Sequence, residues 1–131
     1  MRIIIVWCGG MGTYQAKKFQ QLGVIIVGAI DHNPTNLDTF CTLYAVPWRS
    51  SSLDDLSLMR GKADAVSCAL PDRYHLSCCA TALALGFALF AEKPMGSTLY
   101  DARSIVGASH AVNLHSMVKL LQAEPASPSC P

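Results

Sequence analysis

The hydrophobic residues of this chain fall into short continuous runs that alternate with segments of helical pattern. The runs predict strands over residues 2–6, 24–30, 65–69, 87–91 and 112–118. The intervening segments predict helices over residues 10–22, 36–44, 53–59, 74–85 and 99–109, with a short extra strand near Trp48. Because the strands are continuously apolar and do not alternate with polar positions, they favour a parallel sheet covered on both faces. The alternation of strands and helices predicts a doubly wound α/β fold in a single domain.

Length and charge narrow the classes of protein that this chain can represent. The 131 residues suffice for one domain, which we expect over residues 1–118, followed by a Pro/Ser-rich, disordered tail over 119–131. Ten basic and nine acidic residues leave a net charge of +1, which gives no footprint for nucleic acid or a charged membrane surface. No apolar run approaches the ~20 residues that span a bilayer, and the N-terminal run is too short for a signal peptide. We therefore expect a cytoplasmic protein.

The six cysteines do not predict a metal or redox centre. None of them forms a C-x-x-C pair, and most lie inside apolar segments, where a free cysteine behaves as a small hydrophobic residue. We expect them to be reduced and structural, and we expect no metal site.

The first predicted strand runs into a glycine-rich turn, Trp7-Cys8-Gly9-Gly10-Met11-Gly12, which opens the first helix. In a dinucleotide site, three glycines make the tight turn, admit the pyrophosphate and let the helix pack closely on the strand. Gly9 and Gly12 occupy the second and third of these places, but Trp7 occupies the first. The sequence thus predicts a dinucleotide site at which Trp7 weakens binding.

An acidic residue stands where such a site needs one. Asp31 ends the second predicted strand, 19 positions after Gly12, and a carboxylate there binds the ribose hydroxyls. It would repel a 2′-phosphate, so we expect NAD to be preferred to NADP. The alternative role of Asp31, a turn or capping residue before Asn33 and Pro34, stays open and does not exclude ribose binding.

A lysine follows the strand predicted over residues 87–91. The segment reads Phe90-Ala91-Glu92-Lys93-Pro94, and lysine is rarely buried, whereas strand ends are where open α/β sheets bind ligands. Lys93 is therefore a candidate catalytic residue, and the alternative is a solvated lysine at a strand end.

These motifs, with Val27-Gly28-Ala29-Ile30-Asp31 and Leu70-Pro71-Asp72-Arg73-Tyr74-His75, resemble the N-terminal domain of the Gfo/Idh/MocA oxidoreductases over residues 1–118. The resemblance implies a Rossmann-like fold and hydride transfer between NAD(P) and a sugar or polyol. It also implies a set of cofactor-binding residues: Gly9, Gly10, Met11, Gly12, Asp31, Leu70, Pro71, His75, Glu92 and Lys93. Within this set Lys93 would stand near nicotinamide and substrate, and Glu92 would hold it in place. For His75 a purely structural role stays open.

The sequence also departs from the family pattern. In these enzymes a second domain binds substrate and supplies the catalytic histidine, and we find no counterpart to it after residue 118. Two interpretations follow: the cofactor half of an oxidoreductase, truncated before its substrate domain, or a non-catalytic Rossmann interaction module. Whether the chain is an enzyme by itself stays open. We expect no turnover from the isolated chain, and we expect it to self-associate through the sheet edge that a second domain would cover.

Overall fold

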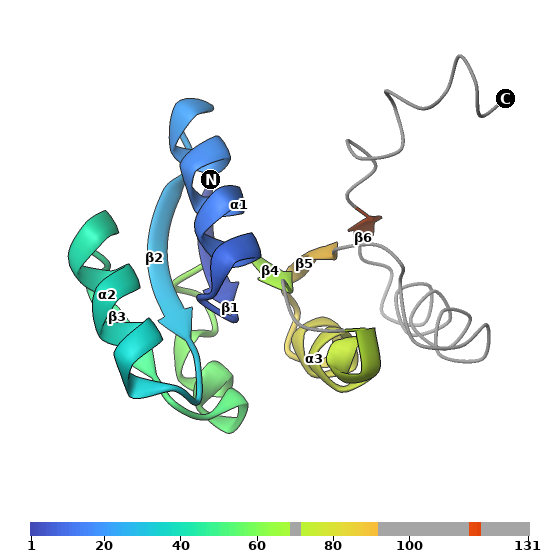
Figure 1. The fold of residues 1–131 in the computed structure, drawn as a ribbon. Helices are drawn as coiled ribbons and strands as arrows, with labels where there is room; N and C mark the ends of the chain where they lie inside the picture. The colour runs from blue at the N-terminus through green and yellow to red at the C-terminus, as the bar shows by residue number, and fades with distance from the viewer. Residues whose placement is uncertain (69–71, 92–115, 119–131) are drawn as a thin grey trace, which may run out of the picture.

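The computed structural model describes residues 1–68, 72–91 and 116–118. It shows one sheet with helices on both sides (Figure 1). The strands are β1 (Arg2–Val6), β2 (Ile25–Ile30), β3 (Trp48–Ser50), β4 (Ala65–Cys68), β5 (Ala88–Ala91) and β6 (Ser116–Val118). Their order in the sheet is β3-β2-β1-β4-β5-β6, and all neighbouring pairs are parallel. The predicted doubly wound parallel sheet is therefore confirmed, including the short strand at Trp48.

The helices are α1 (Gly10–Gln21), α2 (Pro34–Tyr44), the 3-10 helix η1 (Leu53–Met59) and α3 (Asp72–Ala84). Helix α2 begins two residues earlier than predicted, because Pro34 fits the first turn and Asn33 caps it. The Asn33 side chain accepts hydrogen bonds from the N–H groups of Thr35 and Asn36, at 2.9 and 3.1 Å. The helix predicted over residues 99–109 and the tail predicted over 119–131 lie outside the described residues.

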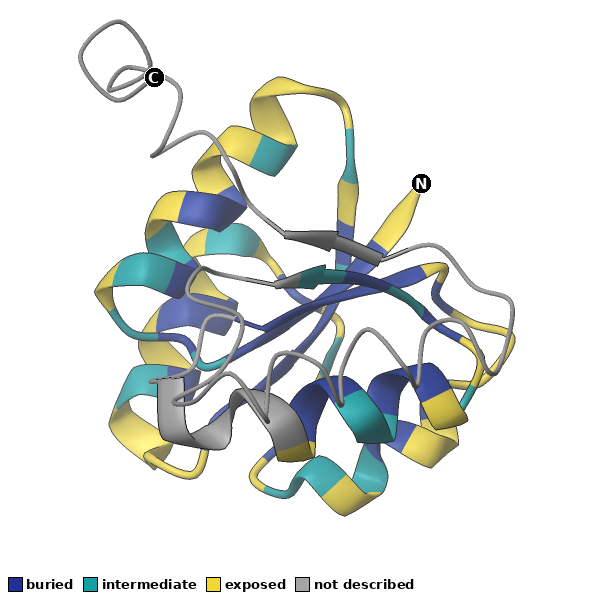
Figure 2. Ribbon diagram, turned by 90° about the vertical axis from the view of Figure 1, so that its right-hand side faces the viewer, coloured by how far each residue is buried: buried dark blue, intermediate teal, exposed yellow. Residues whose placement is uncertain are grey.

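The two faces of the sheet bury separate halves of the core. Successive side chains of a strand point to opposite faces. Ile3 and Ile5 accordingly pack with residues of α1 and α2, whereas Ile4 and Val6 pack with residues of η1 and α3. Figure 2 shows the central strands buried between these layers. This two-sided burial explains why β1 is apolar at every position from Ile3 onward.

Gly28 lies in β2, directly against the indole of Trp48 in β3. A Cβ at this position would lie 2.8 Å from Cε3 of Trp48 and 3.2 Å from Cγ1 of Ile4. We therefore expect Gly28→Ala to lower the free energy of unfolding by about 1–3 kcal/mol, the usual cost of overpacking a core. Urea denaturation followed by circular dichroism measures this change.

Trp48→Leu provides the matched background for this test, because a smaller side chain leaves room for the added methyl group. In that background the loss caused by Gly28→Ala should be clearly smaller. Equal losses in both backgrounds would show that the indole of Trp48 is not the obstacle.

Candidate functional site

The carboxyl ends of four strands lie in register along one edge of the sheet. Val6 of β1 is paired with Ile30 of β2 and with Cys68 of β4, and Cys68 is paired with Ala91 of β5. The strand order reverses between β1 and β4, and open α/β sheets bind ligands outside the carboxyl ends at such a switch point. The glycine turn and Asp31 follow directly from the first two of these strand ends.

The remaining site residues predicted from the sequence come after the ends of β4 and β5. Leu70, Pro71, Glu92 and Lys93 lie outside the described residues. His75 belongs to helix α3, but its side chain is likewise outside the described part. Their roles remain predictions.

The glycine turn brings helix α1 into direct contact with the backbone of the turn. Gly9 is the N-cap, and the first intrahelical hydrogen bond runs from the N–H of Thr13 to the Gly9 carbonyl at 2.9 Å. A Cβ at Gly12 would lie only 2.0 Å from the carbonyl oxygen of Trp7, so this approach requires glycine. Within α1, all of whose residues are described, the N-cap supplies no side-chain hydrogen bond and the first turn no acidic residue. A helix start of this kind suits an anion.

Trp7 adopts a backbone conformation that favours glycine. Its φ is 80°, in the left-handed region that side chains with a Cβ rarely occupy. Its indole lies along the turn, since a Cβ at Gly9 would be 3.6 Å from Nε1 of Trp7. The ring centroids of Trp7 and His32 are 5.0 Å apart. The sequence identified Trp7 as the residue at the sharp turn, but it did not reveal the contact with His32.

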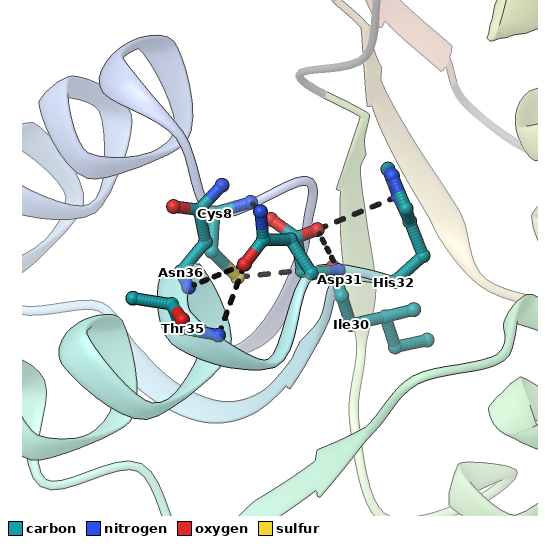
Figure 3. A network of polar contacts seen from close by, with 7 residues as sticks. Cys8, Ile30, Asp31, His32, Thr35 and Asn36 are labelled. Carbon is teal, nitrogen blue, oxygen red and sulfur yellow. Dashed lines mark hydrogen bonds and ion pairs between the residues drawn. The ribbon is translucent and has the colours of Figure 1, made fainter.

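The carboxylate of Asp31 is buried and faces the glycine turn (Figure 3). One oxygen accepts a hydrogen bond from the N–H of Cys8 at 2.9 Å, and the other accepts one from the N–H of Asn33, also at 2.9 Å. Nδ1 of His32 lies 3.6 Å from the second oxygen. Asp31 therefore bonds to the backbone of the turn before α2, while Asn33 caps the helix. Ribose binding by Asp31 stays a prediction.

A buried polar pair joins helix α1 to the centre of β4. The hydroxyl of Ser67 donates a hydrogen bond to Oε1 of Gln15, and both side chains are almost fully buried. The sequence did not reveal this pair. The available signal was the position of Gln15, three residues after Gly12 and therefore on the buried face of α1.

The cysteines only partly follow the expectation of reduced, structural thiols. Cys8, Cys41 and Cys79 are free and buried. Burial, reinforced by Asp31, raises the pKa of the Cys8 thiol to about 12, so this thiol stays protonated at neutral pH. The expectation is wrong for Cys68 and Cys78, which form a disulfide between β4 and α3. The contact between strand and helix that joins them is a feature of the tertiary structure and carries no sequence motif.

The described residues contain no cluster of three or more histidine, cysteine or acidic side chains suited to a metal ion. In that same part of the chain, no helix combines the length and apolar character that crossing a membrane requires.

Comparison with solved structures extends the likeness over nearly all of the chain. An NAD-binding protein from Listeria innocua is 25% identical, with a TM-score of 0.84. The match covers 92% of this chain and 35% of the Listeria chain. A myo-inositol 2-dehydrogenase from Lactobacillus plantarum is 19% identical, with a TM-score of 0.84, and the match covers 93% of this chain and 37% of the dehydrogenase. The WlbA dehydrogenase from Chromobacterium violaceum, solved with NADH and UDP-GlcNAcA, is 22% identical, with a TM-score of 0.84. The match covers 90% of this chain and 34% of the WlbA chain. The chain thus spans about a third of the length of these relatives.

No curated protein matches the sequence. A family model does: the oxidoreductase family described by its NAD-binding Rossmann fold matches residues 1–120. This match confirms the family resemblance that the sequence indicated. The chain therefore belongs to the Gfo/Idh/MocA oxidoreductase family and is an NAD-binding Rossmann domain of that family.

Proposed function

We propose that the chain binds a nicotinamide dinucleotide at the carboxyl edge of its sheet, with NAD preferred to NADP, as the cofactor half of a sugar or polyol oxidoreductase. The observation that carries this proposal is the hydrogen bond of 2.9 Å from the N–H of Cys8 to the Asp31 carboxylate. It joins the two parts that a dinucleotide site needs, the glycine turn for the pyrophosphate and the acidic strand end for the ribose.

The residues of this edge fit the proposed cofactor in two respects. The start of α1 at Gly9 and Gly10 offers backbone N–H groups and the positive end of the helix dipole to the pyrophosphate. Gly12 lets the helix lie against the turn, where even a methyl group would collide with the carbonyl of Trp7. The indole of Trp7 beside Gly9 opposes the fit, and we propose that it weakens binding without abolishing it.

The bound dinucleotide would supply the hydride acceptor or donor, and the chain would hold and orient it. Lys93 is proposed to act near the substrate, where an ammonium group orients a hydroxyl or stabilises developing negative charge on oxygen. Substrate binding is proposed to require a second domain of the kind that the longer relatives have room for. Self-association and a cytoplasmic location remain part of the proposal.

A second function, that of a non-catalytic Rossmann interaction module, is favoured by one observation. Trp7 holds a φ of 80° and places its ring beside Gly9, where a cofactor would approach. A domain under selection for tight dinucleotide binding gains from glycine at this position. Absence of NAD binding in both the unmodified chain and Trp7→Gly would favour the interaction module over the oxidoreductase half.

The proposed preference for NAD has a direct test. We expect NAD to bind at least about tenfold more tightly than NADP, a difference of ~1.4 kcal/mol, because the Asp31 carboxylate repels the 2′-phosphate. Asp31→Asn removes the charge but keeps one oxygen for a backbone amide, so the ratio of the two affinities should narrow. Calorimetric titration with both nucleotides, in the unmodified chain and in the Trp7→Gly background, measures the ratio.

Asp31→Asn is a sharper variant than Asp31→Ala, which would leave the N–H groups of Cys8 and Asn33 without their acceptor, at about 1–3 kcal/mol for the buried N–H of Cys8. Asp38→Asn is the matched control, because it removes an exposed carboxylate of α2 that pairs with Arg49 of β3. This control should leave the ratio unchanged. Tighter binding of NADP by the unmodified chain would refute the assignment of Asp31.

A further inference from the structure

A covalent link joins the sheet to helix α3 at the edge that carries the candidate site. Cys68 is the last residue of β4 and Cys78 lies in the middle of α3; their Cα atoms are 6.7 Å apart, within the range that a disulfide spans. Both side chains are buried, at 0% and 1% exposure. The bond closes a loop between residues only ten positions apart in the sequence.

The position of Cys68 connects this link to the glycine turn. In the parallel register Cys68 lies beside Val6, the last residue of β1, and Val6 immediately precedes Trp7. The N–H of Trp7 in turn donates a hydrogen bond of 2.7 Å to the carbonyl of Ile30 at the end of β2. A disulfide that restrains Cys68 at the end of β4 therefore also restrains Val6, the residue directly before the glycine turn.

We propose that Cys68 and Cys78 are a reversible redox pair that sets the rigidity of the glycine turn, closed as a disulfide by small-molecule disulfides and opened by small thiols. In closure, one protein thiolate attacks the small disulfide, forms a mixed disulfide and releases one small thiol. The second protein thiolate then attacks the mixed disulfide, which forms the protein disulfide and releases the second small thiol. Two protons and two electrons pass to the small disulfide, and the reverse sequence reopens the bond.

The structure pairs Cys68 with Cys78 and leaves the neighbouring cysteines as free thiols. Cys79 is adjacent to Cys78 but is a free thiol at 0% exposure, and burial raises its pKa to about 12. Cys8, within the glycine turn, is likewise free and buried, with its pKa raised to about 12.

The fold should survive opening of the bond. Cys78, Ala82 and Leu83 of α3 pack in the same core cluster as Val66 and Cys68 of β4, and this apolar contact does not depend on the disulfide. Opening of the disulfide therefore removes a restraint and leaves α3 packed against the sheet. Its expected effects are a lower melting temperature and faster opening of the backbone at the ends of β4 and β1.

The first test is equilibration of the full chain in buffers of graded reduced and oxidised glutathione, followed by alkylation and peptide mass spectrometry. We expect Cys68 and Cys78 to pass from alkylated to disulfide-linked together, in one two-electron transition that reverses on adding reduced glutathione. Full alkylation of both residues at every ratio, a bond from either residue to a different cysteine, or a stable mixed disulfide with glutathione would overturn the proposal.

The second test compares oxidised and reduced protein without nucleotide, so that it stays decisive even if the proposed dinucleotide binding fails. Reduction should lower the melting temperature by roughly 5–15 °C, as expected for opening a short cross-linked loop in a domain of this size. It should also speed hydrogen exchange at the amides of Val6, Trp7 and Cys68. Cys68→Ala and Cys78→Ala should abolish both responses to reductant, whereas the matched variant Cys79→Ala should keep them. Exchange rates at Val6 and Trp7 that do not change with redox state would refute the coupling to the turn.

Discussion

Gly12→Ala is expected to destabilise the chain more than any other replacement of a glycine by alanine among the described residues. The added Cβ would lie 2.0 Å from the carbonyl oxygen of Trp7 and 3.4 Å from Cγ2 of Ile5. The first of these atoms belongs to the backbone, so no side-chain rotation relieves the overlap, and α1 must move away from the turn. We expect a loss of more than about 3 kcal/mol in the free energy of unfolding, measured by urea denaturation.

Gly10→Ala is the matched control, two residues earlier in the same helix. A Cβ at Gly10 has no neighbouring atom within 4 Å, and alanine is the better helix former. Its effect should stay within about 1 kcal/mol, of either sign. Similar losses for the two variants would show that α1 is not seated on the Trp7 carbonyl.

Trp7→Gly is expected to strengthen NAD binding by roughly 5- to 150-fold. That range corresponds to the ~1–3 kcal/mol that relief of a steric block of this kind recovers. The variant removes the indole beside Gly9, and it places glycine at a φ of 80°, where glycine carries no steric penalty. Calorimetric titration of both proteins measures the gain.

Trp7→Phe is the control for Trp7→Gly. It tests whether any replacement of Trp7 strengthens binding, or whether the gain requires loss of the aromatic ring and of the Cβ. It keeps an aromatic ring and a Cβ at the same positive φ, so it should bind NAD about as weakly as the unmodified chain. Equal affinity in the unmodified chain and Trp7→Gly would show that the turn accommodates the indole.

The sheet was predictable from the sequence because each strand carries its own signal, a continuous run of apolar residues. Strand β1 presents apolar side chains to both faces of the sheet, from Ile3, Ile4, Ile5 and Val6. A strand of this kind is typical of a parallel sheet that is covered on both faces. The start of α2 was harder to predict, because Asn33 and Pro34 signal a turn as readily as a capped helix. Over the seven residues of η1, hydrophobic periodicity does not distinguish a 3-10 helix from an α-helix.

The site was predictable as a set of positions and unpredictable in its contacts. The spacing of Gly12 and Asp31 predicted that both belong to one dinucleotide site, and the hydrogen bond from the N–H of Cys8 to Asp31 brings their two segments together. The same spacing carries no information on whether the carboxylate faces the turn or the solvent, because its hydrogen-bond partners, the N–H groups of Cys8 and Asn33, come from the turns after two different strands. The disulfide depends in the same way on packing between α3 and β4.

The dinucleotide site is tested by titrating the unmodified chain with NAD and following the backbone amide signals by nuclear magnetic resonance. This method detects weak binding and locates it on the chain. We expect the largest shifts on residues 9–12 at the start of α1 and on residues 31–33 after β2. Shifts concentrated elsewhere on the chain, or no shifts in these segments at millimolar NAD, would contradict a dinucleotide site at the glycine turn.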